Sequence, residues 1–510
     1  MEKNRTISRT DAAKKNITVG IVSKIILLLA SFVSRTLFIR ILGVEYTGIN
    51  SLFTNILGLL NLAELGLGSV FTFELYGLLR ERDIEKVCIY VALFKKIYCV
   101  IAAVISFVGL TLIPFLKAIT HSELPTYYLV FYYLLYLLDS SASYIAVSRT
   151  SVIEADQKRY VTQYVDIASK FTQYIIQIIY LVYRKDFSGY LFIQVFFTIL
   201  RNILLNWLAG KMYPFLKNKT KARLDEKSIH EIIQNVKATF ISRLSDTVMT
   251  QTDSIIISAL IGVVAVGYYS NYNMIVVYIN SIICILFSAI EASVGNLNAE
   301  RNAQKSYCMF RNLSVWFSVL NAFCIAAYIC LVQNFIVIWI GDTYIQPMAL
   351  IGCIVFTFYV NQTMNVLHMY QRTMGLFREM QAVYPVMTVL NVFLSVWLGK
   401  IWGIEGVILA TGISKGMTTF WYEGRVVFSR LGHSFKEYLL QQSKFLIYTI
   451  GMVTISYWLC EMIPQSGFTG MLEKGCIVVA VCILFSLICW GSTEEWKWGL
   501  AIARKKVGKV

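Results

Sequence analysis

The chain has 510 residues, of which 57% are hydrophobic and only 15% are charged. Soluble domains carry about 25% charged residues, so this composition excludes a soluble globular protein and indicates one that crosses a membrane many times. The formal net charge of +16 does not indicate a nucleic-acid partner, because the basic residues form no stripe that follows a phosphate backbone.

The predicted elements are apolar segments of about 20 residues or more, long enough to cross a bilayer as helices. The first 17 residues are charged and polar and contain no short apolar run with a cleavage site, so we expect no signal peptide. In chain order we predict fourteen transmembrane helices, at residues 17–41, 48–77, 88–116, 125–147, 160–183, 189–212, 237–261, 266–296, 309–334, 347–374, 380–399, 404–424, 438–462 and 471–493. The fold class is therefore all-α integral membrane.

Lys and Arg are concentrated in the segments on one side of these helices, among them residues 80–86, the connector at 211–237 and the tail at 501–510. Cytoplasmic loops hold an excess of Lys and Arg, so both termini are expected to be cytoplasmic. The loops on the other side are short and leave no room for a folded domain.

An internal repeat relates the two halves of the chain. The motif G-V-x-x-x-G occurs at Gly43 to Gly48 and again at Gly262 to Gly267, 219 residues later. Six helices per repeat give both halves the same orientation, as in parallel transporter repeats. We therefore predict an N-lobe at 1–215, a cytoplasmic connector at 216–236, a C-lobe at 237–425, and two additional helices with a basic cytoplasmic tail at 426–510.

Motifs for catalysis or cofactor binding are missing from the sequence. It contains neither a GxxxxGK[ST] nucleotide loop nor an HExxH motif. Its eleven cysteines form no CxxC pair and lie almost entirely within apolar runs, which argues against a disulfide framework or a metal site. We predict that the protein is not an enzyme and has neither a cofactor nor a metal.

Polar residues recur every three or four positions in several predicted helices, a spacing that places side chains on one helix face. The clearest stripe is Thr239, Arg243, Asp246, Thr250 and Asp253. Others are Asn50, Thr54, Asn61 and Glu64; Gln163, Asp166, Lys170, Gln173 and Gln177; and Asn361, Asn365, His368 and Arg372. For a single Asn, Thr or Gln the ordinary explanation is a hydrogen bond between helices, which contributes about 0.6 kcal/mol.

The charged members need another explanation, because a charge at the bilayer centre costs from about 3 to more than 10 kcal/mol. We predict that basic residues line a central cavity and bind the substrate, namely Arg35, Lys170, Arg201, Arg243, Lys415 and Arg372. The candidates for ion coupling are Glu64, Asp166, Asp246 and Asp253. Neighbours on one helix face also form ion pairs, and the spacing suggests Asp166 with Lys170 and Arg243 with Asp246.

With these residues, the chain resembles the Wzx-type polysaccharide and O-antigen flippases of the MOP superfamily. The blocks that carry the resemblance are R-x-x-F-I-R-x-L-G-x-E-Y-x-G-I-N-x-L-F at 35–53, L-x-L-A-E-L-G at 60–66, TDSIIIS at 252–258, VGYYSNY at 266–272 and ASVGNL at 292–297. The resemblance covers most of the chain. Carried over by motif, it places the basic position of the first helix at Arg35 and the acidic position of the seventh at Asp253.

The resemblance implies a MATE-like fold in which two six-helix lobes surround a cavity and work by alternating access, with a groove for a lipid tail at the two additional helices. It implies transport of an undecaprenyl-pyrophosphate-linked oligosaccharide to the outer leaflet of the bacterial cytoplasmic (inner) membrane, for O-antigen or capsule synthesis. The implied partners are membrane lipid, a coupling proton or sodium ion, and the glycan polymerase machinery.

Two alternatives stay open on the residues alone. A cation-coupled multidrug exporter of the same superfamily is expected to have an anionic cavity, whereas the predicted cavity here is mixed and basic. A membrane-embedded glycan polymerase needs a catalytic outer loop, and the outer loops are short.

Overall fold

The structure is a computed structural model that describes residues 9–61, 67–217, 226–300, 302–463 and 467–507. Within these ranges the regular structure is helical and no strand occurs, which confirms the all-α class. The chain packs as two compact units, residues 1–267 and residues 268–510. The lobes predicted from the repeat are segments that are expected to move as rigid bodies. This division stays a prediction.

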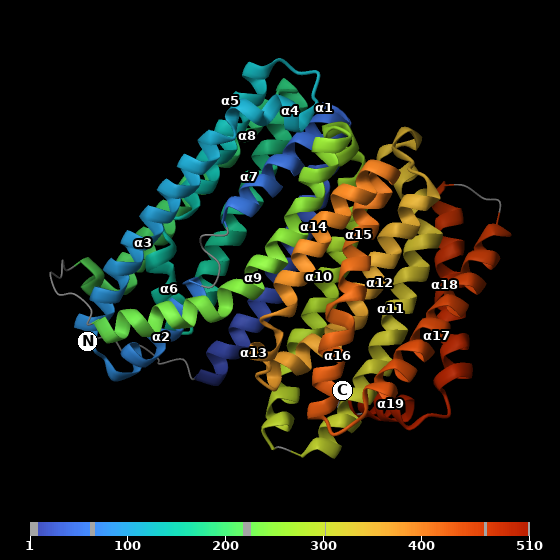
Figure 1. Cartoon of the computed structure of the whole chain (residues 1–510). Coiled ribbons are helices and arrows are strands. Elements are labelled where there is room, and N and C mark those ends of the chain that lie inside the picture. The colour runs from blue at the N-terminus through green and yellow to red at the C-terminus, as the bar shows by residue number, and fades with distance from the viewer. Residues whose placement is uncertain (1–8, 62–66, 218–225, 301, 464–466, 508–510) are drawn as a thin grey trace. The chain divides into compact units, whose positions relative to one another are not determined.

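The first unit is built from long helices and three short ones (Figure 1). Its helices are α1 (Arg9–Leu60), α2 (Leu67–Glu81), α3 (Ile84–Thr111), α4 (Leu116–Thr120), α5 (Thr126–Ser143), α6 (Val147–Ala155), α7 (Arg159–Arg184), α8 (Phe187–Met212) and α9 (Glu226–Leu260), with 3-10 turns at Ile113–Phe115 and Pro214–Lys217. Helix α1 packs against α7 and α9, and α8 packs against α5 and α7. These helices enclose the polar cavity described below.

A kink at Gly43 divides α1 into two helical segments. Gly43 has φ 87° and ψ −174°, a backbone conformation that glycine adopts without the penalty a Cβ brings. The sequence predicted a six-residue turn between two helices here. The structure shortens that turn to one non-helical residue, because residues 44–47 already belong to the second segment.

The core of the first unit is rich in aromatic rings. Phe38, Phe53, Phe71 and Phe94 are all buried, and Phe71 stacks on Phe94 with ring centroids 3.4 Å apart. Aromatic pairs contribute about 0.5–1.5 kcal/mol beyond the area that they bury. The stacked pair joins α2 to α3, while Phe38 and Phe53 of α1 pack against aromatic rings of α8 and α5.

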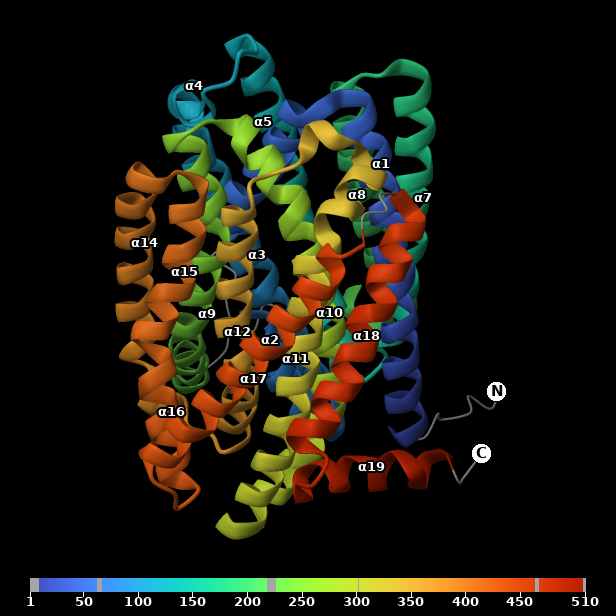
Figure 2. The same cartoon turned by 90° about the vertical axis from the view of Figure 1, so that its right-hand side faces the viewer.

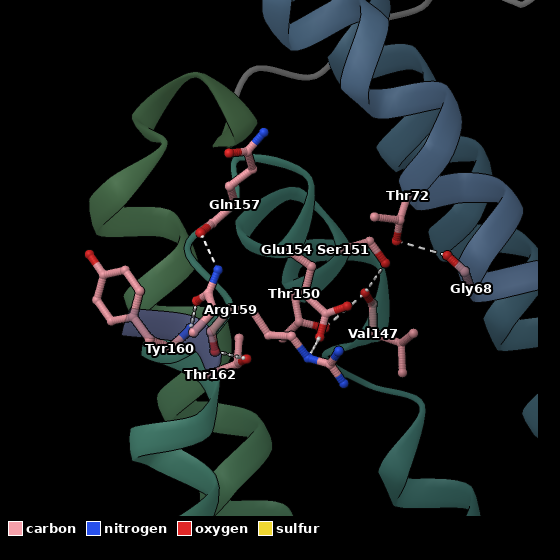
Figure 3. A network of polar contacts seen from close by, with 11 residues as sticks. Gly68, Thr72, Val147, Thr150, Ser151, Glu154, Gln157, Arg159, Tyr160 and Thr162 are labelled. Carbon is pink, nitrogen blue, oxygen red and sulfur yellow. Dashed lines mark hydrogen bonds and ion pairs between the residues drawn. The ribbon is translucent and has the colours of Figure 1, made fainter. Parts of the chain in front are cut away.

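A polar network fixes the start of α7 against α1 (Figure 3). The side-chain amide of Asn16 donates to the Gln157 carbonyl at 2.8 Å, and its oxygen accepts from the backbone N–H of Tyr160 at 2.8 Å. Lys158, the N-cap residue of α7, supplies no side-chain cap, so Asn16 satisfies one of the free N–H groups that begin any helix. Arg159 and Glu154 lie 3.8 Å apart beside it.

The second unit surrounds α11. Its helices are α10 (Val263–Ala299), which begins at the end of the first unit, α11 (Ala303–Ile340), α12 (Met348–Thr373), α13 (Phe377–Met380), α14 (Val383–Trp402), α15 (Ile404–Met417), α16 (Thr419–Arg430), α17 (Phe435–Glu461), α18 (Gly467–Trp490) and α19 (Glu494–Val507). Helix α11 packs against α12, α17, α18 and α19. Figure 2 shows α19 lying across the ends of the neighbouring helices.

Helix α19 is held on α11 by its first residues. Trp496 stacks on Trp316 with ring centroids 4.5 Å apart, and the Trp316 indole N–H donates to the Glu495 carbonyl at 3.0 Å. The Glu495 carboxylate, which is nearly buried, pairs with Arg311. The sequence analysis assigned this stretch to a basic tail and did not predict a helix there.

Among the described residues, nine helices are long and apolar enough to cross a membrane, or ten if the bent pair α5 and α6 is counted as one span. The protein is therefore a multi-pass membrane protein. The count of fourteen stays a prediction. One of these nine spans, Val19–Leu60, covers most of the first predicted helix and the first part of the second. Helix α7 is not among the nine, because its Gln, Asp and Lys side chains lower its hydropathy.

Candidate functional site

A polar cavity of about 450 Å³ lies within the first unit. Five helices contribute to its wall, and polar side chains from each of them line it. The lining residues are Thr54, Asn55, Leu57, Gly58 and Asn61 at the end of α1; Tyr136, Asp139, Ser140 and Ser143 of α5; Lys170 of α7; Gln194, Thr198 and Arg201 of α8; and Gln251 of α9. The cavity thus unites two of the predicted basic residues, Lys170 and Arg201.

Lys170 begins a chain of side-chain hydrogen bonds along α7. Its ammonium donates to Gln173 Oε1 at 3.0 Å, Gln173 donates to Gln177 at 3.4 Å, and Gln177 donates to the Tyr190 carbonyl of α8 at 3.0 Å. Gln173 and Gln177 are buried. The predicted stripe on α7 is therefore an internal polar face, with its cation at the cavity.

Arg201 is neutralised by a carboxylate from the neighbouring helix. Its Nε lies 2.6 Å from Asp166 Oδ1, and its guanidinium also donates to Asn202 Oδ1 at 3.3 Å. Asp166 was expected to pair with Lys170 on its own helix. It pairs with Arg201 instead, because α7 and α8 pack closely enough for the longer arginine to reach it.

Asp139 is a cavity residue that the sequence analysis missed. Its Oδ2 accepts from the Gln194 side chain at 2.8 Å, while its Oδ1 is buried and has no hydrogen-bond partner among the described residues. Lys170 interacts electrostatically with Asp139. The signal was present in the sequence, because Tyr136, Ser140 and Ser143 recur around Asp139 at the spacing of one helix face.

Arg35 approaches the same wall from the first segment of α1. It is half-buried and interacts electrostatically with Tyr136 and Tyr190, and the Tyr136 hydroxyl donates to Asn50. This wall carries mixed charge. Its three cations are Lys170, Arg201 and Arg35, and its two carboxylates are Asp139 and Asp166. It therefore has a small basic excess, and the binding role of its basic residues stays a prediction.

The remaining predicted residues of the first unit lie on α9 or beyond the described residues. Arg243 and Asp246 are exposed on α9, whereas Asp253 is buried. Glu64 lies outside the described residues. Their roles in substrate binding and ion coupling stay predictions.

In the second unit, the two predicted basic residues have separate partners. The Lys415 ammonium of α15 donates to Asn361 Oδ1 of α12 at 2.7 Å. Arg372, near the end of α12, lies 2.7 Å from Glu291 Oε1 of α10. The polar stripe on α12 therefore faces other helices, and a third member, His368, contacts Glu423 of α16.

An apolar groove of about 810 Å³ runs along α18 in the second unit. Its wall is formed by α10, α11 and α18 and is almost entirely aliphatic or aromatic, with Ile275, Phe323, Leu331, Leu472 and Ile483 among its members. A groove of this composition suits a hydrocarbon chain. The sequence analysis expected a groove at the additional helices, of which α18 is one.

The two repeated glycine motifs touch each other at one end of the first unit. A Cβ at Gly48 would overlap the Val263 carbonyl oxygen, and a Cβ at Gly267 would overlap the Val44 carbonyl oxygen. Only glycine allows backbones to approach so closely. We call this crossing of Gly48 and Gly267 the glycine contact.

The segment after α4 packs beside the glycine contact. Ser258 of α9 donates from its hydroxyl to the Ile119 carbonyl at 2.7 Å, and His121 Nδ1 lies 3.2 Å from the Ser258 carbonyl. Glu45, between the glycines of the first motif, accepts from the Ser122 hydroxyl at 2.5 Å. This end of the first unit is therefore closed by side chains and backbone together.

No group of three or more His, Cys, Asp or Glu is arranged to hold a metal ion in the part of the chain that the structure describes. The side chains at the polar cavity can form hydrogen bonds and recognise charge, through Lys170, Arg201, Asp139 and the surrounding amides.

Solved structures of membrane transporters share this fold. The lipid II flippase MurJ in an inward closed conformation matches with a TM-score of 0.67 at 14% identity, covering 92% of this chain and 97% of that one. An inward-facing MATE family multidrug resistance transporter of the MOP superfamily gives 0.60 at 13%, covering 80% and 95%. A mutant of the Vibrio cholerae MATE transporter VcmN gives 0.53 at 11%, covering 83% and 97%.

These likenesses define the class as a multi-pass membrane protein with the fold of MOP superfamily transporters. Residues 13–290 match the family model described as Polysaccharide biosynthesis protein. This match spans more than half of the chain, and the chain belongs to that family. Comparison with curated protein sequences gives no match.

Proposed function

We propose that the protein is a flippase that moves an undecaprenyl-pyrophosphate-linked oligosaccharide from the cytoplasmic to the outer leaflet of the bacterial inner membrane, for surface polysaccharide such as O-antigen or capsule. The polar cavity of the first unit receives the head group, and the protein performs no covalent chemistry on it. Membership of a polysaccharide biosynthesis family supports this substrate class.

The observation that carries the proposal is Lys170 at the cavity wall. Its ammonium is held by Gln173 alone, and none of the described carboxylates lies within ion-pair distance of it. Arg201, by contrast, is occupied by Asp166. A pyrophosphate or an acidic sugar supplies an ion-pair partner in direct contact with Lys170, and a charge-assisted hydrogen bond to phosphate is about twice as strong as a neutral one.

The apolar groove along α18 is the proposed place for the polyprenyl tail. Covering its aliphatic wall with hydrocarbon keeps the tail in an apolar environment while the head group crosses. Moving two negative charges outward at an inside-negative potential of about 150 mV releases roughly 7 kcal/mol, so the membrane potential favours export. A proton or sodium ion is the proposed coupling ion, and contact with the glycan polymerase machinery follows export.

Alternating access is the proposed mechanism, with lobes 1–215 and 237–425 moving against each other. Under this proposal the glycine contact is a closed gate at the outer face, and both chain termini are cytoplasmic. The substrate then enters from the cytoplasmic side, and the gate opens only after binding.

A cation-coupled multidrug exporter is the second candidate, and Asp139 is the observation that favours it. Asp139 lines the same cavity, and its Oδ1 has no hydrogen-bond partner among the described residues. A carboxylate in this place is the kind of anionic acceptor that a cationic drug requires. The fold likeness to MATE transporters is compatible with either candidate.

The test is translocation of a polyprenyl-pyrophosphate oligosaccharide by the full-length protein in vesicles, read out by the fraction that an enzyme added outside can reach. Loss of one charge-assisted contact of about 1.5–3 kcal/mol predicts that Lys170→Ala lowers the rate about 10- to 100-fold, while Lys170→Arg retains part of it. Lys96→Ala is the matched control, because Lys96 is an exposed lysine on α3 and is not part of the cavity wall.

Two outcomes would count against the proposal. If Lys170→Ala translocates like wild type, the cavity does not bind the head group. If the vesicles accumulate a cationic dye and leave the oligosaccharide in place, the exporter candidate is favoured.

A further inference from the structure

Glu423 of α16 is a buried carboxylate that the proposed transport path does not use. Its side chain has no exposed surface, and its ion-pair partner is His368, whose Nε2 lies 3.1 Å from Glu423 Oε2. No described residue donates a hydrogen bond of good geometry to either carboxylate oxygen. An ionised carboxylate without donors is costly to bury, so this residue needs an explanation.

Close packing of α16 on α17 accounts for the burial. Gly424, the next residue, lies against the ring of Tyr438, and a Cβ there would overlap that ring. The Tyr438 hydroxyl is itself buried without a hydrogen-bond partner among the described residues and interacts electrostatically with Glu423. Water is therefore excluded from the side of Glu423 that faces α17.

The helices that pack against α16 carry three exposed lysines, Lys400, Lys436 and Lys444, and several polar groups that have other partners. Arg372 of α12 lies 2.7 Å from Glu291, and Tyr384 of α14 lies 3.2 Å from Gln371. Lys415 of α15 donates to Asn361 at 2.7 Å, and Glu437 of α17 lies 2.7 Å from His433. Among these groups, His368 is the partner able to offset a charge on Glu423.

The proton content of the pair follows from this isolation. A carboxylate beside an imidazolium and a carboxylic acid beside a neutral imidazole contain the same number of protons, and both are neutral overall. Removing that proton leaves a buried negative charge with no counter-charge, and adding a second leaves a buried positive charge. Both changes are unfavourable in a low-dielectric environment, so the closed pair holds one transferable proton.

The pair is also connected to solvent, and Glu423 follows a break between two helices. The His368 side chain is 30% exposed, whereas that of Glu423 is not exposed at all, so a proton reaches the pair from the His368 side. Glu423 lies on α16, which begins at a break in the helix at Thr418 with φ −119° and ψ −83°. A rearrangement that separates α12 from α16 breaks the pair, and the proton then passes to water as hydronium.

We propose that His368 and Glu423 form a proton-binding site of the second unit, which takes up one proton when α12 and α16 are together and releases it when they separate. The coupling of this proton to transport rests on the proposed function. Binding of the proton does not, because it depends only on the geometry of the pair.

Proton binding is tested first, without substrate, by infrared spectroscopy of the full-length protein at neutral pH. We expect wild type to show either a carboxylic acid band or an imidazolium band that is lost in both Glu423→Gln and His368→Gln. Glu379→Gln is the matched control, because Glu379 forms an exposed ion pair with Arg430 at 3.2 Å. Identical bands in wild type and Glu423→Gln would overturn the proposal.

Coupling is tested next in vesicles, by measuring proton movement and oligosaccharide translocation together. We expect about one proton per substrate in wild type and in Glu379→Gln, with the ratio approaching zero in Glu423→Gln and His368→Gln. If the ratio of protons to substrate is unchanged in Glu423→Gln or His368→Gln, the proton is not coupled to transport. The same conclusion follows if a variant stops translocating while its infrared band is intact. If wild type translocates no oligosaccharide, the proposed substrate fails, while the infrared result still decides the proton site.

Discussion

Individual charged side chains in the first unit are stabilised by partners on different helices, and the sequence shows the charges more readily than the partners. Lys170 and Asp166 stand four residues apart on α7, the usual spacing of a helical ion pair, yet Asp166 bonds Arg201 of α8. Sequence spacing identifies which side chains share a face. It does not identify the helix that packs against that face.

A residue at a helix start gives the first prediction of this section. Asp186 caps α8 by accepting from the backbone N–H groups of Ser188 and Gly189, at 3.2 Å and 2.8 Å, and it also accepts from the Tyr180 hydroxyl. Burial alone would raise the pKa of Asp186, but these hydrogen bonds outweigh it and lower the pKa below its ordinary value. The carboxylate therefore stabilises the fold above its ordinary pKa, and this contribution is lost as pH falls through the lowered value.

Asp186→Ala is expected to lower the free energy of unfolding by about 1 kcal/mol at neutral pH, because it removes an N-cap. Asp186→Asn is the matched control, since asparagine caps as well as aspartate while carrying no charge. Thermal unfolding of the solubilised protein measures the difference. Equal melting temperatures for wild type and Asp186→Ala would show that the cap contributes nothing.

At the scale of the helices, the length of an apolar segment predicts a transmembrane helix well. It does not predict the polar helical turns that continue beyond the segment. The predicted ranges 189–212, 347–374 and 438–462 agree closely with α8, α12 and α17. By contrast, α9 begins at Glu226, inside the predicted connector, because a polar helix gives no hydropathy signal. The break at Thr418 between α15 and α16 was missed because the aromatic residues that follow it extend the apolar run.

An engineered disulfide can test whether the closed end of the first unit must open. A Cβ at Gly262 would lie 3.6 Å from the Cβ of His121, within the usual range for a disulfide. In a background without the eleven native cysteines, the pair His121→Cys and Gly262→Cys is expected to crosslink under oxidation. If this end is the outer gate, translocation stops until the disulfide is reduced.

The single variant Gly262→Cys is the necessary control, because Gly262 has φ 127° and any side chain there is strained. Its activity in the absence of oxidant separates strain from crosslinking. Undiminished translocation with the disulfide fully formed would mean that this end of the unit need not open.

At the scale of the whole molecule, the repeat in the sequence and the packing of the chain place boundaries differently. The repeat assigns α9 to the second half, whereas packing joins residues up to 267 to the first unit, with α9 against α1 and α2. The repeat shows which segments of the chain resemble each other in sequence. Packing shows which helix faces are covered in one conformation, and the periodicity of a single sequence does not say which helix covers which face.

The packing of α9 on α1 and α2 predicts that the first unit is less stable without α9. A fragment of residues 1–300 is expected to resist proteolysis in membranes better than a fragment of residues 1–225, because α9 covers the second segment of α1 in the longer one. Limited proteolysis, followed by the half-life of each fragment, gives the comparison. A fragment of residues 1–225 that is as resistant as the longer one would show that α9 is dispensable for the first unit.

The contact between α1 and α9 also sets an order on biosynthesis. Gly58 near the end of α1 lies against the Gln251 side chain of α9, and nearly 200 residues separate the two in the sequence. During synthesis the ribosome delivers α1 through α8 to the membrane before α9 exists. Through that interval the face of α1 at Gly58 that α9 covers has no permanent neighbour, so the insertion machinery or a different helix must shield it until α9 is made.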